Sequence, residues 1–184
     1  MAAFHPTRMM VLFLSIFPLS STAFSADKKP KEIDKLDKTG FSKLHRSAIS
    51  GDLKEATRLV KAGANLNVQQ KNFKGGPLQY AAARGHDKVV KFLIKNGAKI
   101  DAVDKYGRTP LMWAAMKGKK IEINMLLDAG AAIERGTNLR WTALHYSMDG
   151  GHEGASKLLI KRGAPEDAKN SQGKTPEEVK PENK

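Results

Sequence analysis

Residues 109–115 read Thr-Pro-Leu-Met-Trp-Ala-Ala, and this stretch decides the fold because its elements recur along the chain. Its leucine and two alanines are typical of a short helix whose small side chains let another helix approach closely. Its threonine supplies a hydroxyl of the kind that caps free N–H groups at a helix start. Gly118 predicts the helix end, since glycine readily takes the left-handed conformation found there.

The same elements return with a period of 33 residues, lengthened once to 34. Three columns share this spacing: Leu44, Leu78, Leu111 and Leu144; Gly51, Gly85, Gly118 and Gly151; and Gly63, Gly97, Gly130 and Gly163. Three columns with one common period are hard to obtain by chance, and a period of this length predicts stacked supersecondary units.

A second helix is predicted in each unit, after the middle glycine, because apolar residues recur there at helical spacing. Its inner positions are Ala56/Leu59/Val60, Val90/Leu93/Ile94, Ile123/Leu126/Leu127 and Ser156/Leu159/Ile160. A Gly-Ala pair ends the helix, and a polar segment of about ten residues leads to the next unit. No unit has enough apolar surface to be stable alone, so neighbours must stack into one elongated core.

Residues 109–115 and 142–145 resemble the Thr-Pro-Leu-His-x-Ala signature of ankyrin repeats, and the Gly-His and Gly-Ala steps are similar to the rest of that pattern. The resemblance covers residues 39–179, about three quarters of the chain. It implies an all-α ankyrin-repeat solenoid of the bacterial exported or periplasmic type, with short hairpin fingers between the repeats. The expected divisions are full repeats at 39–71, 72–104, 105–137 and 138–170, a truncated polar cap at 171–179, and a C-terminal tail at 180–184.

Two repeats depart from the signature. Repeat two reads Gly-Gly-Pro-Leu-Gln at 75–79 and lacks both the capping hydroxyl and the histidine. Repeat four contains three glycines within residues 150–154 and has Ser147 and Met148 where alanines are usual. Because glycine weakens a helix by up to about 1 kcal/mol per site, we expect looser first turns in these two repeats.

The first 26 residues are interpreted as a cleavable signal peptide. Arg8 precedes an apolar run at 9–19, and small residues follow within 21–25. This run of about 11 residues is well short of the roughly 20 that a membrane-spanning helix needs, so cleavage is favoured over anchoring. Residues 27–38 are nearly all charged and are interpreted as a solvated leader whose Ile33 and Leu36 dock on the first repeat. We therefore expect a periplasmic or secreted protein.

The composition and the motifs of the chain argue against a catalytic or metal-binding function. The chain of 184 residues has no cysteine, which excludes disulfides, thiolate metal sites and a thiol nucleophile. His45 and His145 occupy the signature position, where the ankyrin resemblance implies a structural hydrogen bond to the capping hydroxyl. No nucleophile elbow, phosphate loop or His-Glu-x-x-His motif occurs. We therefore predict no enzyme activity, no cofactor and no metal site.

The resemblance implies a binding groove lined by the fingers and by the exposed side of each first helix. Carried over by position, its apolar residues would be Phe41, Phe73, Tyr106, Leu139 and Trp141. The surrounding cations would be Lys74, Arg84, Arg108, Lys117 and Arg140. Aromatic and arginine anchors within a polar rim are typical of protein-binding surfaces. Trp113, inside the first helix of repeat three, is interpreted instead as packing between repeats.

Charge bears on the kind of partner. The formal net charge is +13, and the four repeats carry +4, +3, +3 and +1. We expect a monomer without a membrane anchor that binds an unidentified protein with an acidic surface, because complementary charge steers association. Lysines on solvated outer faces explain the charge equally well. The open alternatives are a secreted effector that binds a host protein and a basic surface binder of anionic envelope polymer; nucleic acid is disfavoured for an exported chain.

Overall fold

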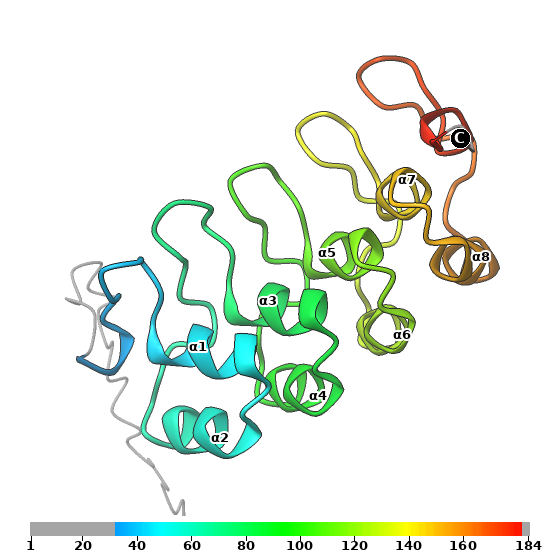
Figure 1. The fold of residues 1–184 in the computed structure, drawn as a ribbon. Helices are drawn as coiled ribbons and strands as arrows, with labels where there is room; N and C mark the ends of the chain where they lie inside the picture. Colours follow the sequence, from blue (N-terminus) through cyan, green and yellow to red (C-terminus); the bar gives the residue numbers. More distant parts are fainter. Residues whose placement is uncertain (1–31, 182–184) are drawn as a thin grey trace, which may run out of the picture.

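The computed structural model describes residues 32–181, which form a row of paired helices with no strand in that range. The first helix of each pair is an inner helix: α1 (Lys43–Ser50), α3 (Pro77–Arg84), α5 (Pro110–Met116) and α7 (Ala143–Asp149). The second is an outer helix: α2 (Leu53–Lys61), α4 (Asp87–Lys95), α6 (Lys120–Asp128) and α8 (Glu153–Lys161). The loops between pairs project to one side of the row (Figure 1). Short 3-10 turns, Glu32–Asp34 and Glu177–Val179, lie at the two ends.

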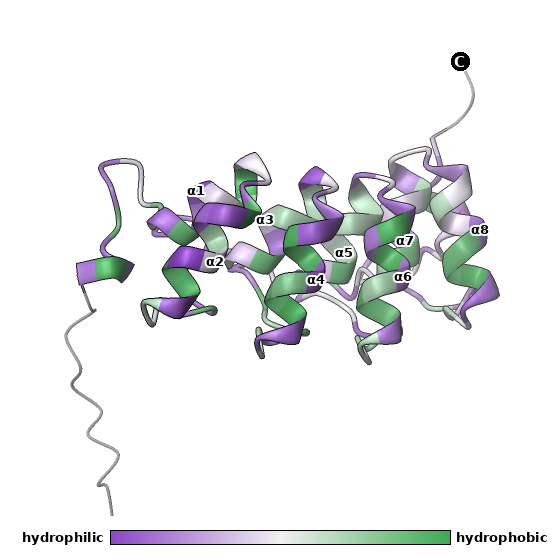
Figure 2. Ribbon diagram, turned by 90° about the horizontal axis from the view of Figure 1, so that it is seen from below, coloured by the Kyte–Doolittle hydropathy of each residue, from purple (hydrophilic) through white to green (hydrophobic). Residues whose placement is uncertain are grey.

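The core is the contact between successive repeats. Each inner helix packs against the next inner helix, and each outer helix against the next outer one. The leucines of the inner column form one buried file, as the period predicts: Leu44, Leu78, Leu111 and Leu144. A parallel file from the outer helices is fully buried: Leu59, Leu93, Leu126 and Leu159. Burying a leucine contributes about 1.5–3 kcal/mol. Hydrophobic and hydrophilic residues alternate along the helices (Figure 2).

The projecting loops are hairpin fingers, each closed by a backbone hydrogen bond across its base. In the third finger the Asp104 amide donates to the Arg108 carbonyl at 3.1 Å. Successive fingers are also joined to one another, as where the Lys105 amide donates to the Phe73 carbonyl at 2.9 Å. These bonds continue to the cap, where Ser171 donates to Leu139. The expected hairpin fingers are thus present as tight turns without strand structure in the described residues.

Two buried histidines connect a helix start to the next finger. Ser42 donates its amide hydrogen to Nδ1 of His45 at 3.1 Å, so Nε2 carries the proton and donates to the Gly75 carbonyl at 3.0 Å. Thr142 and His145 repeat this arrangement, with Lys174 as the distant carbonyl. Burial lowers the pKa of both imidazoles, since the charged form is less well solvated there. The expected structural role of these histidines agrees with the geometry.

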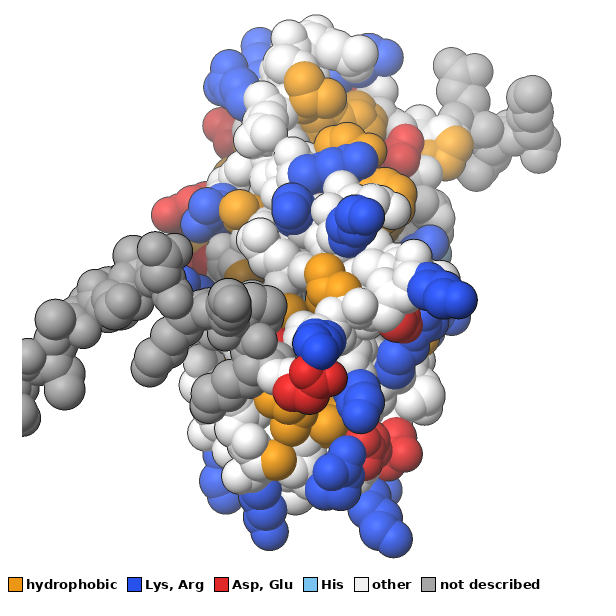
Figure 3. All heavy atoms as spheres, turned by 90° about the vertical axis from the view of Figure 1, so that its left-hand side faces the viewer, with side chains coloured by type: hydrophobic (Ala, Val, Ile, Leu, Met, Phe, Trp, Pro, Cys, Tyr) orange, Lys and Arg blue, Asp and Glu red, His pale blue; other side chains and the backbone are white. Residues whose placement is uncertain are grey.

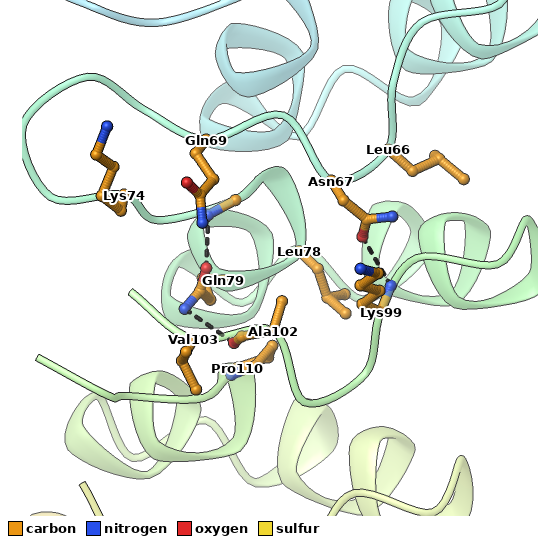
Figure 4. Close-up of a pocket in the computed structure, with 11 residues that line it drawn as sticks. Leu66, Asn67, Gln69, Lys74, Leu78, Gln79, Lys99, Ala102, Val103 and Pro110 are labelled. Atoms are coloured by element: carbon orange, nitrogen blue, oxygen red, sulfur yellow. Dashed lines mark hydrogen bonds between the residues drawn. The ribbon is translucent and has the colours of Figure 1, made fainter. Parts of the chain in front are cut away.

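The first turn of repeat two has no capping hydroxyl, as its sequence predicts, and it is closed in a different way. Gln79 takes the place of the histidine: its Oε1 accepts from the Gly76 amide. Its Nε2 donates to the Arg108 carbonyl at 2.7 Å and to the Ala102 carbonyl at 3.3 Å. Figure 4 shows this glutamine between the bases of the second and third fingers. One amide side chain therefore caps the helix and ties it to the next repeat.

Repeat four also keeps a closed first turn, because the Thr142 hydroxyl accepts from the His145 amide. The effect of its unusual residues is seen in the core instead. Ser147 and Ser156, both buried, hydrogen-bond to each other at 2.9 Å between α7 and α8. The three nearby glycines lie at the end of α7 and in the first turn of α8, away from the start of α7.

The described part of the charged leader belongs to the first repeat, so the boundary expected at residue 39 is moved toward the N-terminus. Asp37 begins the first finger, where its amide donates to the Phe41 carbonyl at 2.8 Å. Asp34 is buried and accepts from the Asn65 amide at 2.8 Å. Ile33 packs on the core as expected, whereas Leu36 stays 40% exposed. The predicted signal peptide, residues 1–26, lies outside the described residues.

Within residues 32–181, no helix is long and apolar enough to cross a membrane.

The two buried histidines predict a stability that falls as the pH is lowered. Their pKa values are lowered in the folded chain, so below about pH 6.5 the unfolded chain binds more protons. The free energy of unfolding should therefore be highest above pH 6.5 and decrease as the pH is lowered toward the folded-state pKa. Urea unfolding at a series of pH values measures this slope.

The control is a double variant, His45→Gln/His145→Gln, which places at both positions the residue that repeat two carries naturally as Gln79. It removes both titrating groups and should flatten the dependence between pH 7 and pH 5. An unchanged slope in this variant would contradict the assignment.

Candidate functional site

Three large apolar side chains are exposed at the tips of neighbouring fingers. Phe73, Tyr106 and Leu139 are 44%, 46% and 63% exposed. The Phe73 and Tyr106 rings lie 6.4 Å apart, and the Lys105 ammonium lies 4.4 Å and 4.9 Å from their centres. We call Phe73, Tyr106 and Leu139 the tip row. The sequence places all three at one repeat position, and the structure brings them together as a line of anchors.

Two of the predicted cations stand at the bend of a finger in the left-handed conformation. Lys74 and Arg140 both have φ of 59°, whereas the equivalent positions in the other fingers are glycines: Gly40, Gly107 and Gly173. A side chain in this region costs roughly 1–2 kcal/mol. Such strain concentrates at functional sites. Lys74 also lines a small cleft between repeats two and three, with Gln79 and Lys99 (Figure 4).

A series of aromatic rings runs along the inner helices next to the fingers. Tyr80 lies edge-on between Phe41 and Trp113, with ring centres 5.3 Å and 5.2 Å away. Further along, Trp141 contacts Tyr146 at 5.2 Å. We call the half-buried surface formed by Phe41, Tyr80, Trp113, Trp141 and Tyr146 the inner face. Sequence reasoning missed Tyr80 and Tyr146, although they share the period-33 column of Trp113, which directly follows the histidine position.

Trp113 packs between repeats as expected, and it also faces the cations of the inner face. Its ring contacts Tyr80 of the preceding repeat, and the Arg108 guanidinium lies 5.0 Å from its centre. Its indole Nε1 donates to Oδ2 of Asp104 at 3.0 Å. The interpretation of Trp113 as packing alone is therefore incomplete, because the residue also contributes to the surface that the fingers and inner helices share.

Asp104 holds the centre of this surface in place. Its buried carboxylate accepts from the Tyr106 amide at 2.8 Å and from the Arg108 amide at 3.0 Å. It also forms an ion pair with Arg108 Nε at 2.7 Å. A buried carboxylate with this many donors is well compensated for the loss of water. The equivalent residue begins every finger, and the column reads Asp37, Gln70, Asp104, Thr137 and Asn170. The column was visible in the sequence and was missed.

Two hollows open beside these rings. The finger hollow is lined by Phe73, Tyr106, Arg108, Thr137, Asn138, Leu139 and Tyr146. The helix-end hollow is lined by Tyr80, Ala83, Arg84, Trp113, Lys117 and Lys119. Six of the ten predicted residues line a hollow: Phe73, Tyr106, Arg108 and Leu139 line the first, whereas Arg84 and Lys117 line the second. Phe41, Trp141, Lys74 and Arg140 line neither hollow.

Basic side chains outnumber acidic ones in this chain, whose formal net charge is +13. Seen from the N-terminal end of the row, Lys and Arg side chains are spread over the described surface (Figure 3). Two arginines beside the inner face are held by carboxylates, Arg46 by Asp37 and Arg108 by Asp104. Between residues 32 and 181, no group of three or more His, Asp or Glu residues is placed to hold a metal ion. The geometry offers apolar anchors and cations to a binding partner.

A row of helix pairs with hairpin fingers on one side defines the class of the protein as an all-α repeat solenoid. Comparison with family models identifies the repeats: a model of three ankyrin repeats matches residues 44–137, and a single ankyrin repeat matches residues 140–171. This chain therefore belongs to the ankyrin repeat family. Ankyrin repeats are protein–protein interaction modules and are generally not catalytic.

Curated relatives share the repeats within much longer proteins. The chain is 36% identical to Ankyrin repeat and SOCS box protein 3 of Bos taurus over 152 residues, which covers 81% of this chain and 29% of that protein. It is 38% identical to the E3 ubiquitin-protein ligase XBAT32 of Arabidopsis thaliana, covering 67% and 25%. It is 30% identical to a transient receptor potential cation channel subfamily A member 1 homolog of Caenorhabditis elegans, covering 76% and 12%.

The chain thus spans less than a third of the length of these relatives. They come from animals and a plant, so they give no support to the expected bacterial exported type.

The left-handed backbone at Lys74 and Arg140 predicts that these two side chains lower the stability of the fold. Replacing Lys74 or Arg140 by glycine removes the backbone strain, so each change should raise the free energy of unfolding by about 1 kcal/mol. Urea unfolding of Lys74→Gly and Arg140→Gly measures it.

A matched control is Gln172→Gly, next to Gly173 in the cap finger, where the backbone is not left-handed. It should give no gain, because glycine there only increases the freedom of the unfolded chain. Loss of stability in both finger variants would show that the two side chains are not strained.

Proposed function

We propose that the chain binds a partner protein across the tip row and the inner face, and that it acts by affinity without chemistry. The observation that carries this proposal is the tip row: three neighbouring fingers each expose one large apolar side chain beside a cation. Exposed apolar groups that lie together on a soluble surface are typical of interaction sites. The membership of the chain in a family of interaction modules supports the same function.

The arrangement suits a protein more than a small ligand. The tip row lies along a rigid series of fingers joined by hydrogen bonds, so its anchors are held in place before binding. Aromatic and arginine side chains contribute most of the energy at protein interfaces. Phe73, Tyr106 and Arg108 line the finger hollow together and would form such a centre.

The partner in this proposal has an acidic surface and lies in the periplasm or outside the cell. The net charge of +13 and the cations around both hollows support the acidic surface. The basic start, the apolar run at 9–19 and the small residues after it support export by a cleavable signal peptide. The chain could then serve within the envelope or, as the second candidate, act as a secreted effector on a host protein.

A crosslinking experiment tests the proposal in intact cells. A photocrosslinking amino acid at position 106, on the tip row, should capture a specific protein that mass spectrometry identifies. With that protein purified, the triple variant Phe73→Ser/Tyr106→Ser/Leu139→Ser should bind it about a hundredfold more weakly, since each hot-spot side chain contributes more than about 1 kcal/mol. Circular dichroism should show unchanged helix content, because the three side chains lie outside the core.

Ile121→Ser is the matched control: this residue is 60% exposed on outer helix α6, so its loss should leave binding unchanged. Equal weakening by the control, or none by the triple variant, would contradict the proposal. A partner that resides only in the cytosol would contradict export. Binding that weakens steeply with salt and is unchanged in the triple variant would favour the alternative that the chain is a basic surface binder of anionic polymer.

A further inference from the structure

The helix-end hollow gathers three cations around an aromatic floor. Tyr80 and Trp113 form the floor, and Arg84, Lys117 and Lys119 surround it. No acidic residue lines the hollow. Within the described part of the chain, none of these three cations forms an ion pair, whereas four arginines elsewhere each pair with a carboxylate: Arg46, Arg58, Arg108 and Arg162. The lining of the hollow therefore offers positive charge without a paired carboxylate; Glu122, which does not line the hollow, interacts electrostatically with Lys119.

Lys119 replaces a structural histidine at this joint. In repeats two and four the same position is His86 and His152, whose Nε2 atoms hydrogen-bond to the carbonyls of Ile49 and Met116 in the preceding repeat. The Lys119 side chain instead packs against Gly85: its Cδ, Cε and Nζ lie 3.2–3.3 Å from the point where a Cβ of Gly85 would stand. Lys119 occupies the sequence position of the imidazole but does not make the corresponding hydrogen bond to a carbonyl of the preceding repeat. Its side chain lines the helix-end hollow instead.

We infer that the helix-end hollow binds a carboxylate side chain from an acidic segment of a protein partner. This inference rests on the proposed function and names the chemistry of one contact within it. Arginine and lysine hydrogen-bond strongly to carboxylates when water is partly excluded. The half-buried Tyr80 and Trp113 line the hollow beside these cations.

A protein carboxylate is favoured over nucleic acid because neighbouring groups already contact both rings of the hollow. Trp113 has the Arg108 guanidinium over it at 5.0 Å and Tyr80 against it at 5.2 Å. Tyr80 is itself packed between Phe41 and Trp113. Binding of single-stranded nucleic acid depends on bases that stack on free aromatic faces, and the Arg108 guanidinium already lies over the Trp113 ring.

Fluorescence anisotropy with a labelled peptide rich in glutamate tests the inference on the full chain at fixed ionic strength. The wild-type chain should bind this peptide and should not bind the same peptide with glutamine in place of glutamate. The double variant Arg84→Gln/Lys119→Met should weaken binding about tenfold or more, since it removes two charge-assisted contacts. Methionine keeps the apolar stem over Gly85, and a thermal unfolding curve checks that the fold is retained.

The matched control is Lys88→Gln/Lys91→Met, which removes the same charge from the exposed face of outer helix α4. This variant should change the dissociation constant less than about twofold, because distant exposed charges are screened by salt. Equal weakening by both double variants would overturn the inference, since the peptide would then respond only to net charge. No binding of the glutamate peptide, or binding only of a phosphoserine peptide or a single-stranded oligonucleotide, would also overturn it.

The outcome separates this inference from the proposed function. If the tip-row variant loses the crosslinked protein while the Arg84→Gln/Lys119→Met variant keeps its affinity for the glutamate peptide, the inference fails and the proposed function stands. If the hollow variant loses the peptide while the tip-row variant keeps the crosslinked protein, the hollow is an anion site and the tip row is not the interface.

Discussion

Stacking between neighbouring repeats is the interaction on which every other feature depends. A single helix pair has too little apolar surface to offset the entropy lost on folding. The two leucine files are buried only because each repeat covers the next. The same stacking sets the distance between fingers, since Lys105 can donate to the Phe73 carbonyl only when repeats two and three are in contact. The tip row and the inner face are therefore products of the stack.

Polar side chains fix the register of this stack. His45, Gln79 and His145 each lie in the first turn of an inner helix and hydrogen-bond to a carbonyl in the following finger. Buried polar groups must be satisfied, so a shift of one repeat against the next would leave these groups without partners. Gln79 shows that an amide side chain can supply this donor as well as an imidazole, whereas repeat three carries Met112 at the same position, which has no donor.

The period of 33 predicted the helices, the leucine files and the position of the tip row, because those features depend on spacing alone. It did not predict the part played by Asp104, whose carboxylate contacts Trp113 nine residues away through the folding of a finger back onto a helix. It also placed the start of the repeats at residue 39. The ankyrin signature begins at the start of the inner helix, so it does not include the finger that precedes the helix. Asp37 belongs to no motif, and its place at the start of the first finger is recognised only when the equivalent residues of all the fingers are aligned.

Surface and fold place opposite demands on a few residues. Lys74 and Arg140 adopt a conformation that suits glycine, and Lys119 omits a hydrogen bond that His86 and His152 make. In each case a cation stands where another residue would satisfy the backbone better. All three lie in the repeats whose fingers and helix ends form the two hollows, where selection for binding can outweigh a local loss of about 1 kcal/mol.

Native-state hydrogen exchange tests the dependence on stacking most directly. Helices α3 and α5 have neighbours on both sides, whereas α1 and α8 lie at the ends of the row. The amides of α3 and α5 should therefore exchange most slowly and through a common opening, with protection decreasing toward both ends. Equal protection in all four repeats, or exchange of α5 through an opening of lower free energy than that of α1, would contradict a core built from contacts between repeats.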